Sequence, residues 1–330
     1  LLLTQSAYAA DLFTVPETDK SKLWFLDILF PDNLADSPLA STMTILNRGA
    51  FENSGTNNCM TKKRRFDSHV HTTYSPDSKD PMAAYAARVD AGIADGIGFA
   101  EHYDFLPICG AWKYLDEACY LAEVADWRAR GYAFFAGVEV DYVHKVEGDI
   151  RRTLRQFPFD FVIGSIHTID PWTISDREIE HFYDDAIFEQ ILTEYADEFA
   201  ASLAVPEFDV VGHPGVFQRY LDDRFFAGKP WRSRIRELED DLAARSARSD
   251  KLVEVNTSGL FSVSKQPCAT PFFLERYRAH GGRTISLGSD SHAAAHLRRG
   301  FDEVAPLLRA LGFDEIHVPW DRAHPIPLSD

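Results

Sequence analysis

The sequence predicts an α/β protein whose main domain is a barrel of parallel strands with helices outside. Three observations support this fold class. The chain has 330 residues, 45% of them hydrophobic, which is enough for a large buried core. From residue 66 onward, short apolar runs alternate with helical patterns, as expected for a parallel sheet covered by helices. Seven such units over about 230 residues suit a barrel better than an open sheet, which usually has fewer strands.

The predicted strands are the seven apolar runs, and most of them are followed by a helical pattern. The strands cover residues 64–71, 96–102, 132–142, 159–167, 208–215, 251–259 and 283–292. Apolar residues at helical spacing predict helices over residues 79–96, 115–131, 176–202, 231–248 and 270–282. In the first of these helices, Asp80 is expected to cap the amino end, Pro81 suits the first turn, and Gly96 follows the end.

The net charge of −17, from 34 basic and 51 acidic residues, argues against a protein that binds long nucleic acid, which would need a basic face. The four cysteines form no Cys-x-x-Cys pair, so a reducing compartment is the simplest reading, and we expect residues 60–330 to be cytoplasmic. Those residues contain no stretch near the ~20 apolar residues of a membrane span. The sequence sets no oligomeric state.

Residues 1–59 are expected to be a separate N-terminal extension, because they are rich in Asn, Ser, Thr and Asp and show no sustained period. Met60 then precedes a short basic stretch and a strand, like a natural translation start. The first residues, "LLLTQSAYAADLF", resemble the end of a secretory signal. Two interpretations stay open: a segment foreign to the domain over residues 60–330, or a poorly ordered native extension.

Almost every predicted strand ends at histidine, aspartate or glutamate. These residues are His69, His71, Glu101, His102, Glu139, His167, His213, Asp290 and His292. The carboxyl ends of parallel barrel strands meet at one mouth, so residues far apart in sequence converge there. The spacing of His69 and His71 places both side chains on one face of a strand. The remaining histidines are interpreted as surface or helix residues: His144, His181, His280, His296, His317 and His324.

These ligand types predict a metal centre. Imidazole and carboxylate together suit Zn²⁺, Mn²⁺ or Fe²⁺, and the lack of a candidate cysteine argues against a closed structural zinc site. Six histidines and several carboxylates exceed the needs of one ion, so two or three divalent ions are expected.

The motifs then become specific for a family. "DSHVHTTYSPDSKDPM", "GFAEHYD", "GVEVDY", "DFVIGSIHTID", "DVVGHPG", "LVEVNTSGL" and "LGSDSH" occur in this order. With these motifs the chain resembles the PHP (polymerase and histidinol phosphatase) family over about residues 64–320, and within it the histidinol-phosphate phosphatases. The resemblance implies a distorted (β/α)7, TIM-like barrel with a trinuclear metal site, and residues 1–59 lie outside it.

Carried over to this chain, the resemblance implies three metal positions. His69, His71, Glu139 and Asp290 would hold the first ion, and Glu139 would bridge to a second ion held also by His167 and His213. The third ion would be held by Asp77, His102 and His292. Asp77 stands where some family members have histidine. Glu101 is expected to hydrogen-bond beside the ligands rather than bind metal.

The implied reaction is hydrolysis of a small phosphomonoester, with L-histidinol phosphate as the expected substrate. The residues expected to act in catalysis are Glu139, Asp290, Arg219 and Glu101. Arg219 is the candidate phosphate clamp, with a surface charge as its alternative. Glu254, Asn256 and Ser258 could face the organic part of the substrate, although Asn256 and Ser258 are equally explained by a turn before Gly259.

Three alternatives remain open. One is another PHP activity, a phosphoesterase acting on nucleotides. The second is a PHP barrel without catalysis that serves as a structural module, which the complete set of ligand positions disfavours. The third is an amidohydrolase, which also begins with His-x-His on a barrel strand. "GSIH" followed by "GHPG" favours PHP over this third alternative.

Overall fold

The computed structural model describes residues 64–177 and 179–328. The expected extension over residues 1–59 and its boundary at Met60 lie outside these residues. No helix within the described ranges is long and apolar enough to cross a membrane.

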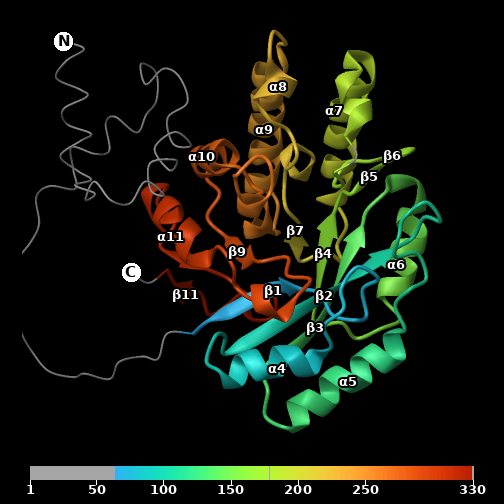
Figure 1. Cartoon of the computed structure of the whole chain (residues 1–330), viewed down its shortest axis with the longest axis vertical. Coiled ribbons are helices and arrows are strands. Elements are labelled where there is room, and N and C mark those ends of the chain that lie inside the picture. The colour runs from blue at the N-terminus through green and yellow to red at the C-terminus, as the bar shows by residue number, and fades with distance from the viewer. Residues whose placement is uncertain (1–63, 178, 329–330) are drawn as a thin grey trace, which may run out of the picture. The chain divides into compact units, whose positions relative to one another are not determined.

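Seven parallel strands form one sheet that curls into a nearly closed barrel (Figure 1). In sheet order they are β1 (Phe66–Val70), β2 (Gly96–Asp104), β3 (Phe134–Asp141), β4 (Phe161–Ser165), β7 (Val210–Val211), β8 (Leu252–Asn256) and β9 (Ile285–Gly288). The predicted distorted barrel of seven strands is thereby confirmed. β7 is shorter than predicted, because the chain turns away at His213, whose φ is +22°.

Side-chain and backbone contacts between β1 and the segment after β9 close the barrel. Val70 and Ser291 form an isolated parallel bridge, and the amide of Asp290 donates to the carbonyl of His69 at 2.9 Å. The buried carboxylate of Asp67 accepts hydrogen bonds from the amide of Ser289 at 3.0 Å and from its hydroxyl at 2.5 Å. These contacts fix the first strand against the last one, and we call them the β1–β9 seam.

Helices surround the sheet in chain order (Figure 1). They are α4 (Met82–Asp90), α5 (Glu117–Ala129), α6 (Glu147–Leu154), α7 (Asp185–Ser202), α8 (Asp223–Phe226), α9 (Trp231–Arg248), α10 (Pro271–Ala279) and α11 (Phe301–Ala310). Two small hairpins are added, β5 (Thr168–Ile169) with β6 (Trp172–Thr173), and β10 (Glu315–Ile316) with β11 (Ile326–Pro327). Short 3-10 turns cover His144–Val146, Glu180–Tyr183, Val216–Gln218, Thr257–Phe261, Ala294–His296 and Pro319–Asp321.

The predicted caps of α4 are wrong. Pro81, not Asp80, is the N-cap, and the carboxylate of Asp80 accepts a hydrogen bond from the amide of Ala294 at 2.7 Å instead. The helix ends at Asp90, two residues before Gly92, whose φ of +74° suits the turn that follows. Gly96 begins β2 rather than following the helix.

Aromatic side chains fill the barrel end at which the strands begin. The ring of Trp320 stacks on Phe135 with centroids 4.1 Å apart and lies 5.4 Å from the ring of Phe161. A Cβ at Gly98 would lie 2.3 Å from Trp320, and one at Gly137 would lie 2.3 Å from Phe161. These glycines leave room for an aromatic plug, defined as Trp320, Phe135 and Phe161.

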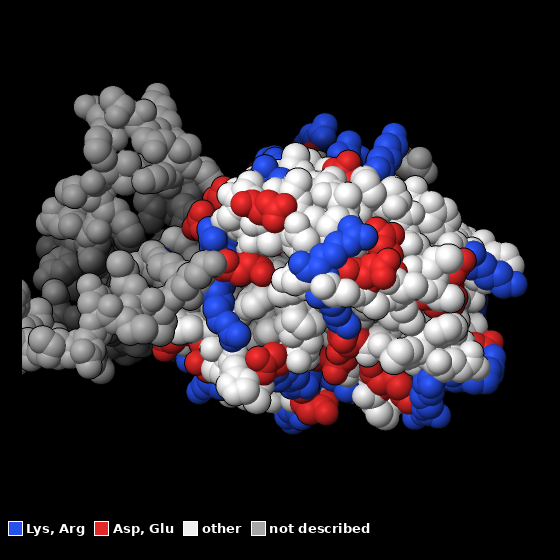
Figure 2. Space-filling view, turned by 90° about the horizontal axis from the view of Figure 1, so that it is seen from below, with Lys and Arg blue, Asp and Glu red and all other residues white. Residues whose placement is uncertain are grey.

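Acidic and basic side chains are interspersed on the face shown in Figure 2, and no continuous basic area crosses the described part of that face. The arginines of α6 and of its C-cap, Arg155, illustrate this mixing. Arg151 and Arg155 both bind Glu207, and Arg152 binds Asp149. The positive charges on this helix are therefore neutralised by neighbouring carboxylates.

Candidate metal centre

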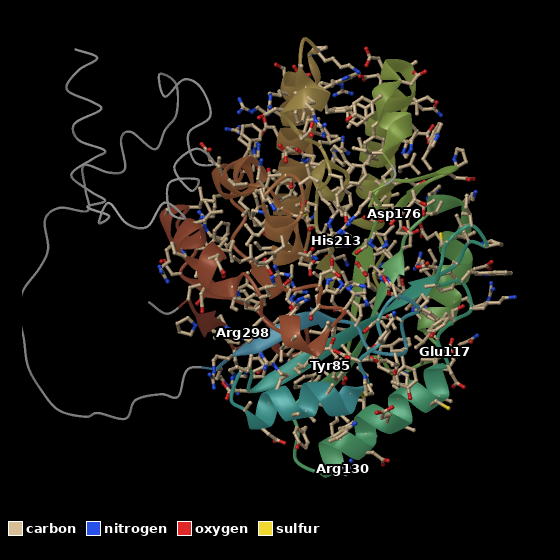
Figure 3. The ribbon with its side chains drawn as sticks, in the orientation of Figure 1. Tyr85, Glu117, Arg130, Asp176, His213 and Arg298 are labelled. Atoms are coloured by element: carbon tan, nitrogen blue, oxygen red, sulfur yellow. The ribbon has the colours of Figure 1, made fainter. Side chains whose placement is uncertain are left out.

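The nine predicted ligands come together at the barrel end where the strands finish. They lie on β1 and the loop after it (His69, His71, Asp77), on β2 and β3 (His102, Glu139), and just after β4, β7 and β9 (His167, His213, Asp290, His292). Figure 3 labels His213 in the middle of the molecule, between the surrounding helices. The parallel register of the strands produces this convergence.

Glu139 is the centre of the cluster. It is buried, and each of its two oxygens faces a different group of imidazoles. Oε1 lies 2.6 Å from Nε2 of His213 and 3.3 Å from Nε2 of His167. Oε2 lies 3.3 Å from Nε2 of His69 and 3.6 Å from Nε2 of His71. The carboxylate thus has the arrangement needed to bridge two cations.

Hydrogen bonds orient two of the histidine rings so that Nε2 points inward. Nδ1 of His69 donates to the carboxylate of Glu254 at 2.6 Å. Nδ1 of His71 lies 3.1 Å from the hydroxyl of Ser75, which itself donates to Glu101 and therefore accepts from His71. Both Nε2 atoms then carry lone pairs, and they lie only 3.1 Å apart. Two lone pairs directed at one point fit a bound cation.

A second group lies beside the first. Nδ1 of His292 donates to the backbone carbonyl of Asp290 at 3.0 Å, which leaves its Nε2 as an acceptor. That Nε2 lies 3.0 Å from the carboxylate of Asp77 and 3.4 Å from Nε2 of His102. His71 is close enough to His102 and His292 to share an ion with them. Asp77 is the most exposed member of the group.

The charges of the cluster shift several pKa values. Burial raises the pKa of Glu139, but the imidazoles of His69 and His167 outweigh this effect and hold it well below its usual value. Burial and the nearby charges of His292 and His102 lower the pKa of His71 well below its usual range. Glu139 and His71 are therefore in the anionic and neutral forms that bind metal. Burial lowers the pKa of His69, His102, His167 and His292, but the neighbouring carboxylates outweigh burial and raise it, so these rings would release protons on binding a cation.

Glu254 is buried against two of the predicted ligands, which differs from the sequence-based expectation that it faces the substrate. Its side chain is buried, with one oxygen on Nδ1 of His69 and the other accepting from the amide of His213 at 2.8 Å. Asn256 is also fully buried, and its Oδ1 accepts from the amide and the hydroxyl of Ser258. The turn interpretation of Asn256 and Ser258 is what the structure displays.

Glu101 lies beside the cluster and makes hydrogen bonds with β1 and the loop after it. Its oxygens accept from the amide of Thr72 at 3.0 and 3.1 Å, from the hydroxyl of Thr72 at 2.7 Å and from Ser75 at 2.7 Å. These contacts occupy the carboxylate and hold the loop that carries His71. They match the supporting position that the sequence predicts for Glu101.

Arg219 lies at the edge of the cluster. Its Nη2 donates to the hydroxyl of Ser258 at 2.7 Å and lies 3.8 Å from Oδ2 of Asp290. Its Nε is buried without a hydrogen-bond partner among the described residues. A cavity of about 220 Å³ borders this guanidinium and is also lined by Gln218, Asp222 and Cys268. Arg219 is therefore not a plain surface charge, which is the alternative interpretation of this residue.

Sequence reasoning missed some supporting residues, although alternation along the strands could have found them. Ser165 lies two residues before His167 and donates to Oε1 of Glu139 at 2.7 Å. Asp141 lies two residues after Glu139 and accepts from the amide of His167 at 2.8 Å. The prediction for His317 is wrong, because this side chain is buried and its Nδ1 lies 3.1 Å from the carbonyl of Arg322.

Comparisons with known proteins identify a matching family and several relatives. The family model described as PHP domain matches residues 67–258. The histidinol-phosphatase of Lactococcus lactis subsp. lactis is 26% identical over 265 residues, covering 77% of this chain and 93% of that protein. The probable histidinol-phosphatase of Clostridium acetobutylicum is 26% identical over 233 residues, covering 69% and 86%.

Two solved structures share the fold. The crystal structure of histidinol phosphate phosphatase from L. lactis subsp. lactis, complexed with zinc, L-histidinol and phosphate, has a TM-score of 0.66 at 23% identity and covers 77% of this chain and 96% of that one. The putative histidinol phosphatase of Listeria monocytogenes has a TM-score of 0.62 at 19% identity and covers 72% and 99%.

Proposed function

Because this chain belongs to the PHP domain family, we propose that it is a metal-dependent phosphatase that hydrolyses a small phosphomonoester. The proposed substrate is L-histidinol phosphate, with L-histidinol and phosphate as products, as a step of histidine biosynthesis. The relatives named histidinol-phosphatase support this choice, since they match most of their own length. The reaction class is hydrolysis of a phosphoric monoester.

The observation that carries the proposal is the position of Glu139 between two groups of imidazoles. His167 and His213 approach one of its oxygens, and His69 and His71 approach the other. A buried carboxylate in these surroundings is the arrangement of a bridged pair of cations, and such pairs serve phosphoryl transfer. Nine oxygen and nitrogen ligands would hold three divalent ions of zinc, manganese or iron.

Different residues of the chain would have different roles around these ions. When bound, divalent ions lower the pKa of water to near neutrality and neutralise phosphoryl oxygens. Glu139 would hold two ions at a fixed separation. Asp290 would complete the first position, since its Oδ1 lies 3.4 Å from Nε2 of His71. Asp77, His102 and His292 would form the third position.

Arg219 would bind the phosphate group. Burial lowers its pKa, but the carboxylate of Asp290 outweighs this effect and keeps the guanidinium cationic. Its unpartnered Nε and its Nη2 can each donate to a phosphoryl oxygen, a geometry that guanidinium groups favour. The hydroxyl of Ser258 accepts a hydrogen bond from Nη2 and so holds this side chain in place.

Phosphate release from a panel of monoesters tests the proposed function. The panel contains L-histidinol phosphate, mononucleotides, sugar phosphates and p-nitrophenyl phosphate, assayed with protein of measured metal content. We expect kcat/KM to be largest for L-histidinol phosphate and to vanish when a chelator removes the ions. Higher kcat/KM for a mononucleotide would favour the alternative PHP activity, and no phosphate release from any ester would favour a non-catalytic module.

The proposal includes a cytoplasmic location. Cys109, Cys119 and Cys268 are free thiols. Free thiols are the usual state of cysteines in a reducing compartment.

A further inference from the structure

Glu254 lies below the metal centre and touches ligands of two different metal positions. The side chain comes from β8 and is 1% exposed. Its Oε1 lies 2.6 Å from Nδ1 of His69, and its Oε2 lies 2.8 Å from the amide nitrogen of His213. His69 belongs to the group on Oε2 of Glu139, and His213 belongs to the group on Oε1.

The contact with His69 determines the tautomer and the orientation of that ring. A carboxylate on Nδ1 fixes the tautomer with hydrogen on Nδ1 and leaves the lone pair on Nε2. It also fixes the rotation of the ring, because His69 is fully buried and its Nε2 must reach a point shared with His71.

The contact with His213 acts through the backbone. His213 has a φ of +22°, a conformation that residues other than glycine rarely adopt. Its Nδ1 is buried and has no hydrogen-bond partner among the described residues, so no side-chain contact of that atom sets the ring. The hydrogen bond from its amide to Glu254 therefore holds the strained turn, and the turn directs Nε2 to Glu139.

We propose that Glu254 is a positioning residue that couples the two metal positions on either side of Glu139. One rigid carboxylate sets His69 for the first ion and His213 for the second, so the two positions form or fail together. This inference rests on the proposed metal centre of the phosphatase and assigns Glu254 no contact with the substrate.

Gly288 supports the same conclusion from the neighbouring strand. A Cβ at this residue would lie 2.2 Å from Oε1 of Glu254 and 2.5 Å from Cβ of His69. Both neighbours are fixed by packing and hydrogen bonds, so they cannot move aside without breaking the contact between them. Glycine at residue 288 therefore keeps open the space in which the carboxylate meets the ring.

Two substitutions disturb this contact in different ways, and each has a matched control. Glu254→Gln keeps the shape but removes the charge, and Gly288→Ala keeps the charge but displaces it. Glu239→Gln changes another buried glutamate, one that binds Thr270 and Gln218, neither of which is a predicted ligand. Gly148→Ala changes a glycine of α6 whose added Cβ would meet nothing within 4 Å.

Chelator competition measures the affinity of the full chain for Zn²⁺ and for Mn²⁺. Mass spectrometry measures the metal content, and thermal denaturation gives Tm with and without the ions. We expect Glu254→Gln and Gly288→Ala to weaken two ions together by roughly 10–100-fold, the usual effect of losing a partner of a metal-bound histidine. The rise in Tm on adding metal should shrink, while both controls keep the affinity of the unaltered chain.

The proposal is overturned if both variants bind two ions as tightly as the unaltered chain, or if only one ion is weakened. It is also overturned if the unaltered chain binds fewer than two ions. These outcomes are independent of the substrate, because no ester is present. A protein that binds its ions as described but releases no phosphate would contradict the proposed function and leave the coupling intact.

Discussion

Five imidazole rings approach the carboxylate of Glu139. This crowding indicates which single substitutions should reduce metal binding and activity most. His102 completes the set, with Nδ1 3.1 Å from Oε2. A buried charge with so many partners is costly to alter, because it compensates the surrounding imidazoles and would compensate the proposed cations. Arg219 is different, since it lies at the edge and would bind the phosphate beside the ions.

Glu139→Gln should be the most damaging single substitution in the centre. It keeps the shape of the side chain but removes the charge that would balance the two proposed cations, so metal content and kcat should fall together. The expected loss of kcat is at least ~10²–10³, the size of one electrostatic interaction in a transition state. Steady-state kinetics with metal analysis measures this effect. Near-native turnover with full metal content would show that Glu139 is no bridge.

Arg219→Ala should cause a smaller loss that appears mainly in KM, because the ions would still hold the phosphate. Arg224→Ala is the matched control, since Arg224 is exposed and pairs with its neighbour Asp222. Both variants are compared with the unaltered chain over a range of substrate concentrations. A fall in kcat as large as that of Glu139→Gln, at unchanged KM, would instead show that Arg219 stabilises the transition state.

At the scale of strands and helices, residues with a regular period were predictable and residues set by distant contacts were not. The helix over residues 231–248 has the predicted bounds, because its apolar residues repeat on one face. The cap of α4 was mispredicted because Asp80 bonds to Ala294, 214 residues away. Glu254 was assigned to the substrate for a similar reason. Alternation along β8 does not reveal that His69 lies beside it.

The convergence of the nine predicted ligands could be predicted, because histidine, aspartate or glutamate recurs at the strand ends and the strand ends meet in any parallel barrel. The supporting contacts needed the structure. The hydroxyl of Tyr85, labelled in Figure 3, donates to the carbonyls of His71 at 2.8 Å and Ser291 at 3.2 Å. In the sequence Tyr85 is only one apolar residue of a helix, so its bond to the metal loop could not be predicted.

The aromatic plug gives a prediction at this scale. Trp320→Ala should lower the free energy of unfolding by about 3 kcal/mol, near the lower end for aromatic truncation because the ring is only partly buried. Metal affinity should stay unchanged, since the plug lies at the opposite barrel end. Trp112→Ala, which removes an exposed ring, is the control. Urea denaturation compares them, and equal stability of the two variants would contradict a role for the plug.

At the scale of the whole molecule, the candidate metal centre and the aromatic plug lie at opposite ends of one barrel. The metal centre lies where the strands finish, and the plug lies where they begin. The negative net charge of −17 is compatible with an anionic ester, because the proposed ions and Arg219 would set the local electrostatic field. The predicted barrel domain from residue 60 contains every residue that the proposed reaction uses.

A shortened chain that begins at Met60 should therefore fold and keep its activity. The motivation is the change of composition at residue 60 and the location of all nine predicted ligands beyond it. Circular dichroism, metal content and phosphate release compare the shortened chain with the full one. If the shortened chain folds and binds its ions but loses activity, residues 1–59 contribute to the site and the predicted division is wrong.

The β1–β9 seam also imposes an order on biosynthesis. Asp67 and Ser289 are 222 residues apart, so at ribosomal rates the first strand waits roughly 10–45 seconds for its last neighbour. During that interval the growing sheet has an open edge, whose unpaired backbone groups can pair with other nascent chains. A polypeptide stalled before residue 285 would also lack Asp290 and His292. Chaperones that shield open sheet edges should therefore bind this chain until translation has passed the seam.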